Sequence, residues 1–337
     1  PNIGELFFPG TTGLNNLAND PCAGAAPTND AALAALCVAQ GAPAGQIGNI
    51  GQPPAGQINT TTGGNLNLDT EQAETWTLGF IAQPDAIPGL TVTVDYFNIS
   101  IEDAIGSPAI GDIISGCYNS GNLDFNTNPF CQLVSRSPTT GEIAGAVNEV
   151  QGLLLNLTNL GQLSTDGIDV RVNYGTDLTD DIAINFNFEG TWTNENRFQA
   201  IAGSPDSLNR DCVGFFSVNC GSIQPEFVFN QRTTLSFLDD YSVSLRWRYL
   251  SGVEQEPDDI ANGNGEAFIG NSPVFGDVDF TELPAESYFD LTFQWDVIEN
   301  VLFTATVTNL FDNQPGIGGS NIGTTACNSG NVYPSTY

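Results

Sequence analysis

The stretch Tyr241-Ser-Val-Ser-Leu-Arg-Trp-Arg-Tyr-Leu250 decides the fold class. Its odd positions are all apolar or aromatic, and its even positions up to Arg248 are Ser or Arg. Successive side chains of a β-strand point to opposite faces, so this period of two predicts a strand with one apolar and one polar face. Two-faced strands of this kind are typical of antiparallel sheets, whose faces meet different surroundings.

The same alternation recurs at 168–174, 182–189 and 289–297. Together with less regular segments, it predicts nine strands, at 1–9, 71–83, 90–103, 147–175, 182–199, 225–238, 241–254, 285–297 and 301–311. Alternation alone does not separate a soluble sandwich from a membrane barrel, because both have one apolar face.

The connections between the predicted strands separate these two classes. Short connections at 84–89, 176–181, 239–240 and 298–300 alternate with long ones at 10–70, 104–146, 200–224 and 255–284. Short turns at one end and long loops at the other are the arrangement of outer-membrane barrels, with turns periplasmic and loops extracellular. The prediction is therefore an all-β, antiparallel transmembrane β-barrel. Bacterial barrels have an even number of strands, so nine strands predict a partial barrel whose closing strand is absent.

Composition restricts the function classes. Among 337 residues there are 39 acidic and 7 basic residues, a formal net charge of −32, and no His. Such an acidic chain repels nucleic acid, so no nucleic-acid partner is expected. Without His the common charge-relay arrangements cannot be built, and phosphate-binding and dinucleotide Gly motifs are missing. We therefore expect no enzyme, no catalytic residue, no cofactor and no metal.

The acidic runs Glu254–Asp259 and Asp277–Asp279 carry oxygen ligands but no twelve-residue calcium pattern, which favours solvated loops.

Six of the seven Cys fall into close pairs, Cys22 with Cys37, Cys117 with Cys131, and Cys212 with Cys220. Each pair lies in a predicted long loop, which is typical of local disulfides formed in an oxidising compartment. Reduced thiols in a cytosolic protein are the alternative. Cys327 is left over, and its partner stays open.

Short motifs along the chain, in a fixed order, carry a family resemblance. The most specific is Asn309-Leu-Phe-Asp-Asn-Gln-Pro315. The others are Pro1-Asn2 with Glu5-Leu-Phe7, Asn67-Leu-Asp69 with Glu71, Glu74-Thr-Trp76 and Gly79, Val94–Ile99, Thr165–Asp169, and Tyr333–Tyr337. Over nearly the whole chain they resemble the C-terminal part of the barrel of TonB-dependent outer-membrane receptors. Asp69 and Thr70 depart from the family pattern.

The resemblance implies a barrel of about 22 strands filled by an N-terminal plug domain. Residues 1–337 would form its C-terminal portion, with the plug outside the sequence. The implied location is the bacterial outer membrane, and the implied partners are the TonB complex through the plug, outer-membrane lipid, and an extracellular small-molecule or oligosaccharide ligand. The implied function is energy-dependent uptake of a scarce nutrient, a siderophore, a cofactor or an oligosaccharide. The acidic loops favour a neutral or cationic ligand. A structural or adhesive extracellular assembly, built through exposed strand edges, is the alternative.

Charged residues on the polar strand faces are the candidate site. They are expected to face the barrel lumen and to contact the plug or the ligand, and they are Asp95, Asp169, Arg171, Glu189, Arg232, Arg246, Arg248, Asp290 and Asp296. Arg pairs with carboxylates or binds an anionic ligand in bidentate fashion, and pairing within the barrel or with the plug is the commoner role of interior charges. We expect Arg246 and Arg248 to anchor the plug.

Aromatic residues on the opposite strand face are expected to form girdles at the two membrane surfaces. They are Trp76, Tyr96, Tyr174, Trp192, Tyr241, Trp247, Tyr249, Tyr288 and Trp295. Ordinary strand packing is the alternative role for these rings.

Overall fold

The computed structural model describes residues 1–17, 19–159, 161–199, 209–216, 220, 223–255, 269–272, 276–279 and 282–316. Cys327, the motif Tyr333–Tyr337 and residues 256–259 of the first acidic run lie outside them. In this described part, no helix has the length and apolar composition needed to cross a membrane.

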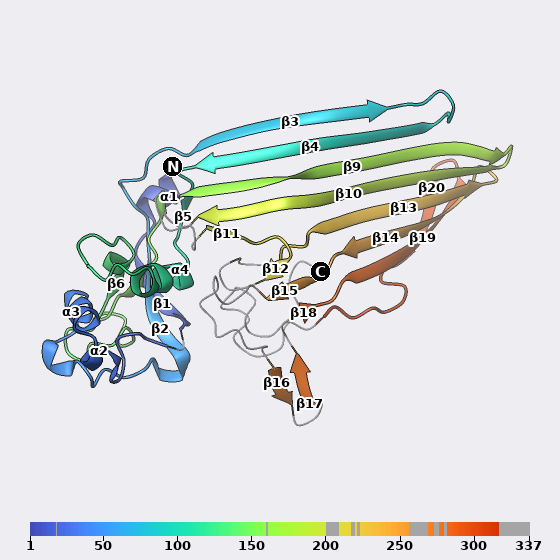
Figure 1. The fold of residues 1–337 in the computed structure, drawn as a ribbon. Helices are drawn as coiled ribbons and strands as arrows, with labels where there is room; N and C mark the ends of the chain where they lie inside the picture. The colour runs from blue at the N-terminus through green and yellow to red at the C-terminus, as the bar shows by residue number, and fades with distance from the viewer. Residues whose placement is uncertain are drawn as a thin grey trace.

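One curved antiparallel sheet dominates the fold (Figure 1). Its long strands follow each other in chain order, each pairing with the next: β3 (Gln72–Ala82), β4 (Leu90–Glu102), β9 (Gln162–Thr179), β10 (Ile182–Gln199), β13 (Phe227–Phe237), β14 (Tyr241–Leu250), β19 (Glu286–Ile298) and β20 (Val301–Val307). The short strand β11 (Asn209–Asp211) pairs with the end of β10. Among the described strands, β3 and β20 each have one neighbour in this sheet, so the sheet is open. The predicted all-β antiparallel architecture is confirmed.

The turns at one end of the sheet are tight. Only two or three residues join β9 to β10, β13 to β14 and β19 to β20. In the turn after β13, Leu238 and Asp239 have φ of 54° and 58°, the left-handed pair that a type I′ hairpin turn requires. At the other end the connections are long, as the sequence pattern predicts. We call these the turn end and the loop end.

Eight of the nine predicted strands are present, and β10 has the predicted bounds. The predicted strand at 1–9 is wrong, because Ile3–Phe7 form the helix α1. Asn2 caps this helix: its side chain accepts a hydrogen bond from the Glu5 backbone, and the Glu5 side chain accepts one from the Asn2 backbone. This reciprocal capping box favours helix at this position. The strand predicted from 147 begins only at Gln162, where β9 starts.

Residues 1–71 and 103–161 fold together at the loop end, and we call them the loop domain (Figure 1). Its sheet has the order β1-β2-β7-β6, and its buried core centres on Ile58, Ile113 and Leu153. Its elements are β1 (Thr11–Asn16), α2 (Ala26–Asn29), α3 (Ala31–Ala39), η1 (Ala44–Gln46), η2 (Pro54–Gly56), β2 (Gln57–Thr62), β5 (Ile105–Gly106), α4 (Ile110–Ile114), η3 (Ser115–Asn119), η4 (Cys131–Leu133), β6 (Val134–Ser135), β7 (Gly152–Leu154) and β8 (Thr158–Asn159). The core is therefore built from two segments separated by the β3–β4 hairpin.

The remaining short strands lie beyond the loop ends of β10 and β14. They are β12 (Phe215–Phe216), β15 (Val253–Gln255), β16 (Ile269–Ser272), β17 (Gly276–Asp279) and β18 (Glu282–Leu283). The strands β12, β15 and β18 form one small sheet, and β16 pairs with β17.

A buried ion pair joins the two segments of the loop domain. Arg136 Nη1 and Nη2 donate to the two carboxylate oxygens of Asp20, each at 2.7 Å, and both side chains are fully buried. Gln40 Oε1 accepts from Arg136 Nε at 2.9 Å and from the Tyr118 hydroxyl at 2.7 Å. Burial raises the pKa of Tyr118. Burial alone would lower the pKa of Arg136, but Tyr118 and Asp20 raise it, so Arg136 carries its charge.

The three expected Cys pairs are disulfide-bonded in the structure. Cys22–Cys37 and Cys117–Cys131 lie in the loop domain, and Cys212–Cys220 closes a smaller loop after β11. The two bonds of the loop domain flank the buried ion pair, because the Tyr118 hydroxyl lies 3.7 Å from Cys22 Sγ and Gln40 Nε2 lies 3.4 Å from Cys117 Sγ.

Candidate functional site

The strand register assigns the candidate residues to one face of the main sheet. Directly paired residues of antiparallel strands point to the same side. Three rows of such pairs cross the sheet, at the loop ends of β13, β14 and β19, in the middle of β9 and β10, and in the turn-end half of β4. The first row is Asp95, Asp169, Thr191, Val228, Leu250 and Glu286; the second is Thr93, Arg171, Glu189, Asn230, Arg248 and Tyr288; the third is Thr91, Asn173, Asn187, Arg232, Arg246 and Asp290.

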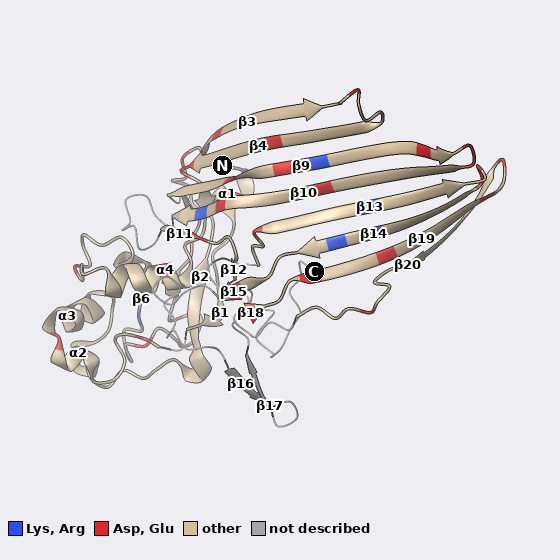
Figure 2. Cartoon of the chain, turned by 45° about the vertical axis from the view of Figure 1, so that its right-hand side comes forward, with Lys and Arg blue, Asp and Glu red and all other residues tan. Residues whose placement is uncertain are grey.

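These rows place eight of the nine predicted site residues on one face, which we call the polar face. The ninth, Asp296, lies on the same side of β19, six positions closer to the turn end. Figure 2 shows charged residues on the long strands β4, β9, β10, β14 and β19. Their contact with a plug or a ligand stays a prediction.

Tyr288 is a correction to the aromatic assignment. It pairs with Arg248 and therefore lies on the polar face, where it is 6% exposed. The Arg248 guanidinium carbon is 5.3 Å from the centre of its ring, a cation–π contact. This contact accounts for an aromatic ring among the polar side chains.

The half of the polar face on β13, β14 and β19 is positively charged. Arg232, Arg246 and Arg248 face two carboxylates in these rows, Asp290 and Glu286, which leaves a net charge of +1. Arg248 Nη2 lies 3.3 Å from Asp290 Oδ1. Arg246 Nε donates to the side-chain oxygen of Asn230 at 2.8 Å, and Arg232 Nη1 donates to a Ser hydroxyl of β14 at 3.0 Å. These hydrogen bonds of Arg246 and Arg232 are therefore made to neutral groups.

The half on β4, β9 and β10 is negatively charged. Asp95, Asp169 and Glu189 face one cation, Arg171, which leaves a net charge of −2. Arg171 Nε lies 3.9 Å from Glu189 Oε1, and both side chains are more than half exposed, so this pair is weak. Asp169 Oδ1 accepts a hydrogen bond from the Thr191 hydroxyl at 2.6 Å.

Asp95 and Asp169 are directly opposite each other, an arrangement that costs energy for like charges. Gly79 on β3 relieves it. A Cβ atom at Gly79 would collide with Asp95 Oδ1, so the Asp95 carboxylate lies over this glycine, on the side away from β9. The glycine noted in the sequence motif is therefore required for the close approach of a neighbouring side chain.

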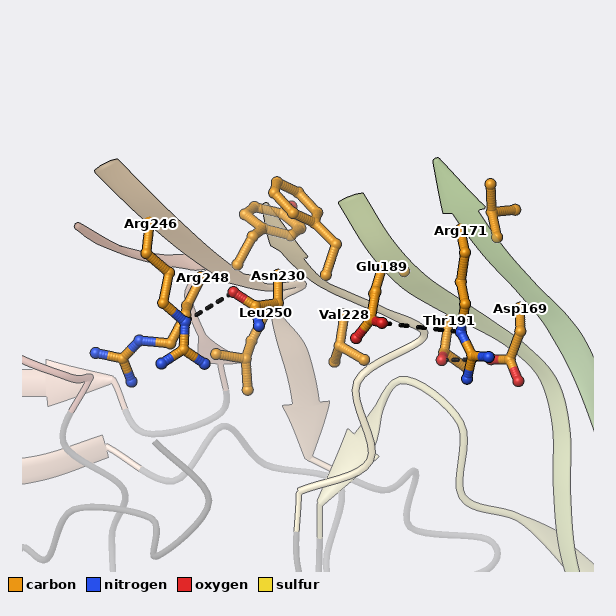
Figure 3. Close-up of a pocket in the computed structure, with 13 residues that line it drawn as sticks. Asp169, Arg171, Glu189, Thr191, Val228, Asn230, Arg246, Arg248 and Leu250 are labelled. Atoms are coloured by element: carbon orange, nitrogen blue, oxygen red, sulfur yellow. Dashed lines mark hydrogen bonds and ion pairs between the residues drawn. The ribbon is translucent and has the colours of Figure 1, made fainter. Parts of the chain in front are cut away.

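A pocket of about 450 Å³ connects the two halves. Figure 3 shows Arg246 and Arg248 at one end and Asp169, Arg171 and Glu189 at the other. The uncharged residues Asn230, Val228 and Leu250 lie between these ends. The pocket is thus charged with opposite sign at its two ends and neutral in the middle.

The segment after β20 holds the positive end in place. The Asn309 backbone donates to Asp290 Oδ1 at 2.9 Å. Asn313 Nδ2 and the Gly316 backbone donate to the two carboxylate oxygens of Glu286, at 2.6 and 3.0 Å. We call residues 309–316 the clasp. The sequence identified most of it as a family motif but did not predict this role, because its hydrogen bonds reach back to a distant strand.

Two buried polar atoms at the positive end have no hydrogen-bond partner in the described part of the chain. They are Arg248 Nε and the Tyr288 hydroxyl oxygen. Leaving a buried polar atom unpaired costs about 1–3 kcal/mol.

Metal chemistry finds no support among the described residues. No group of three or more His, Cys, Asp or Glu side chains is placed there to hold an ion. The acidic run at 277–279 forms part of β17.

The opposite face, which we call the apolar face, carries aromatic residues at two heights. At the turn end, Tyr241 stacks on Phe237, Phe293 and Trp295, with ring centres 5.6–6.3 Å apart. Near the loop ends of β13, β14 and β19 lies a cluster of Phe227, Phe229, Trp247, Tyr249 and Phe289, and Trp76 packs on Tyr96 in the middle of β4. Tyr241 and Trp247 are six residues apart on one strand, which corresponds to about 20 Å.

Comparison with known proteins gives one family. The sequence model of the TonB-dependent receptor-like β-barrel matches residues 1–310. A comparison with curated protein sequences finds no match.

Similar solved structures include a mutant of the ferric enterobactin receptor PfeA from Pseudomonas aeruginosa, with 14% identity, 82% of this chain and 31% of that chain covered, and a TM-score of 0.45. The siderophore receptor PirA from Pseudomonas aeruginosa has 14% identity, 78% and 31% coverage, and a TM-score of 0.38. The iron transporter FrpB from Neisseria meningitidis has 12% identity, 79% and 30% coverage, and a TM-score of 0.42. The chain spans about a third of the length of these proteins.

Proposed function

The chain belongs to the TonB-dependent receptor β-barrel family, and on this premise we propose that it forms part of the wall of an outer-membrane receptor for energy-dependent uptake of a scarce nutrient. The observation that carries the proposal is the two-faced sheet within the family match: a charged polar face with a pocket, backed by an apolar face with aromatic rings at two heights. A siderophore, a cofactor and an oligosaccharide are the substrate classes to test.

The apolar face supports a place in the outer membrane. Barrel walls present an apolar band about 25 Å tall, flanked by aromatic girdles. The two aromatic groups on β14 are about 20 Å apart along the strand, which is close to this height. Of the predicted girdle residues only Tyr288 lies on the other face, and the role of the rest stays part of the proposal.

The disulfides support an extracellular position for the loop end. Both disulfides of the loop domain, and Cys212–Cys220, lie at this end of the sheet. Disulfides persist in oxidising surroundings, and long barrel loops face the outside of the cell. The pocket reaches the loop ends of β13 and β14 and would then open there toward the incoming ligand. Coupling to the TonB complex through a plug domain belongs to the same proposal.

Uptake by whole cells tests this function. The full-length receptor would be expressed in a host that lacks its own uptake systems, and accumulation of labelled candidates from the three substrate classes measured with and without TonB. We expect accumulation of one class, and its loss when TonB is deleted or the proton gradient is dissipated. A strain with the empty vector is the control. Accumulation that does not change without TonB would refute energy-dependent import.

A further inference from the structure

We propose that the pocket on the polar face is a bipolar ligand site that takes a zwitterionic small molecule. The anionic group of the ligand lies against Arg246 and Arg248, and its cationic group lies against Asp169 and Glu189. This inference rests on the proposed function, because a receptor wall is where a ligand of this kind would pass.

The segregation of charge is the first argument. If wall charges served only to neutralise each other, cations and anions would alternate between neighbouring strands. Instead the half on β4, β9 and β10 carries −2 and the half on β13, β14 and β19 carries +1. Charges of opposite sign that are held apart by protein stabilise a ligand with the complementary pair of charges.

The choice of hydrogen-bond partners is the second argument. Arg246 Nε is bound to a neutral amide, that of Asn230, and Asp169 Oδ1 to a neutral hydroxyl, that of Thr191. Neutral partners orient a charged group without neutralising it. Arg246 lies opposite Asp290, and the Nη groups of its planar guanidinium can bind a ligand carboxylate in bidentate fashion.

The distance between the ends sets the length of the ligand. Neighbouring strands are about 4.8 Å apart. Glu189 on β10 is two strands from Arg248 on β14, which gives about 10 Å, and Asp169 on β9 is three strands away, which gives about 14 Å. An extended chain of four amino acids spans at most about 13–14 Å. The site therefore fits opposite charges roughly 10–14 Å apart.

The middle of the pocket fits an uncharged linker. Val228 and Leu250 are apolar, and Asn230 can hydrogen-bond an amide or a hydroxyl. A ligand of uniform negative charge would place part of that charge beside Asp169 and Glu189, and one of uniform positive charge would meet the Arg pair. Both are disfavoured by like-charge repulsion.

Binding of a matched set of peptides to the full-length receptor in detergent tests the inference. The probes are tetraglycine, which carries both charges, N-acetyl-tetraglycine, which keeps only the anion, and tetraglycine amide, which keeps only the cation. Affinities come from calorimetric titration at low salt. We expect tetraglycine to bind at least about tenfold more tightly than either derivative, because each derivative loses one charge-assisted contact.

Two double variants assign the ends. Arg246→Gln with Arg248→Gln should weaken tetraglycine and N-acetyl-tetraglycine but not the amide. Asp169→Asn with Glu189→Gln should weaken tetraglycine and the amide but not the acetylated probe. Arg197→Gln is the control, because Arg197 pairs with Glu195 away from the pocket.

Equal affinity for the three probes, or no binding of any probe at 10 mM, would overturn the inference. The absence of binding would also favour a protein segment such as a plug as the occupant of the pocket. Binding is measured without an energy source. Absence of peptide binding therefore does not contradict energy-dependent uptake, and absence of uptake does not contradict a measured binding affinity.

Discussion

Replacing Arg136 by Met should destabilise the loop domain far more than the loss of an ordinary ion pair. The Arg136 and Asp20 side chains are 0% and 1% exposed, and the Arg donates to Asp20, Gln40, Tyr118 and the Gly141 carbonyl. The variant leaves the Asp20 carboxylate buried without its cation. Breaking a buried pair in this way costs about 3–5 kcal/mol, whereas an exposed pair contributes about 0.2–1 kcal/mol.

Hydrogen exchange in the intact receptor measures this effect. At about 1.4 kcal/mol per tenfold, amides of the loop domain should exchange roughly 100- to 4,000-fold faster, while those of β13 and β14 keep their rates. Arg197→Met, which breaks the half-exposed pair with Glu195, should change exchange by less than about tenfold. Arg136→Met combined with Asp20→Leu should recover most of the loss, since an apolar pair can replace a buried ion pair. A single variant with unchanged exchange, or a double variant as unstable as the single one, would refute the reasoning.

Three further outcomes follow from local geometry. Gly79→Ala should lower the unfolding temperature, because its Cβ displaces the carboxylate of Asp95, and adding Asp95→Ala should restore it; a lack of rescue would contradict this account. Asn309→Ala should make the clasp sensitive to limited proteolysis, because Asn309 has a φ of 51° and exchanges two hydrogen bonds with Asn313. Asn309→Gly should have an intermediate sensitivity, because Gly adopts a positive φ without strain but lacks the side chain that makes these bonds. The loop domain should lose stability as pH rises above about 10. Burial raises the pKa of Tyr118 above its ordinary value of 10.0, so the Tyr118 hydroxyl loses its proton at a lower pH in the unfolded chain than in the folded one. Tyr118→Phe should remove that dependence in exchange measured from pH 8 to 11.

The polar face was predictable because it depends on a local pattern. Along β10 the alternation is unbroken through residue 189, and the bounds of the strand agree with the prediction. Arg246 and Arg248 follow from the same period of two. The rule fails for Tyr288, since a ring with a hydroxyl suits either face and an Arg beside it decides the outcome.

Contacts between distant segments were not predictable in this way. Arg136 lies between two Ser residues in a loop, and nothing near it indicates that Asp20, 116 residues earlier, completes its surroundings. The same holds for the division of charge across the sheet, because it depends on which strands are neighbours. The capping box of Asn2 and Glu5 is a local signal for a helix, and the prediction of a strand at 1–9 did not take it into account.

The divided core of the loop domain has a consequence for the evolution and engineering of this protein. Loops on a barrel can usually be exchanged one at a time, because each depends on its own strands. Here one segment supplies Ile58 and Asp20 and the other supplies Ile113 and Arg136, so neither half completes the shared core or the ion pair alone. The two loops should therefore be inherited and transplanted as a pair, together with the β3–β4 hairpin between them. A chimera that carries only one of them would replace a folded domain with two unpaired halves.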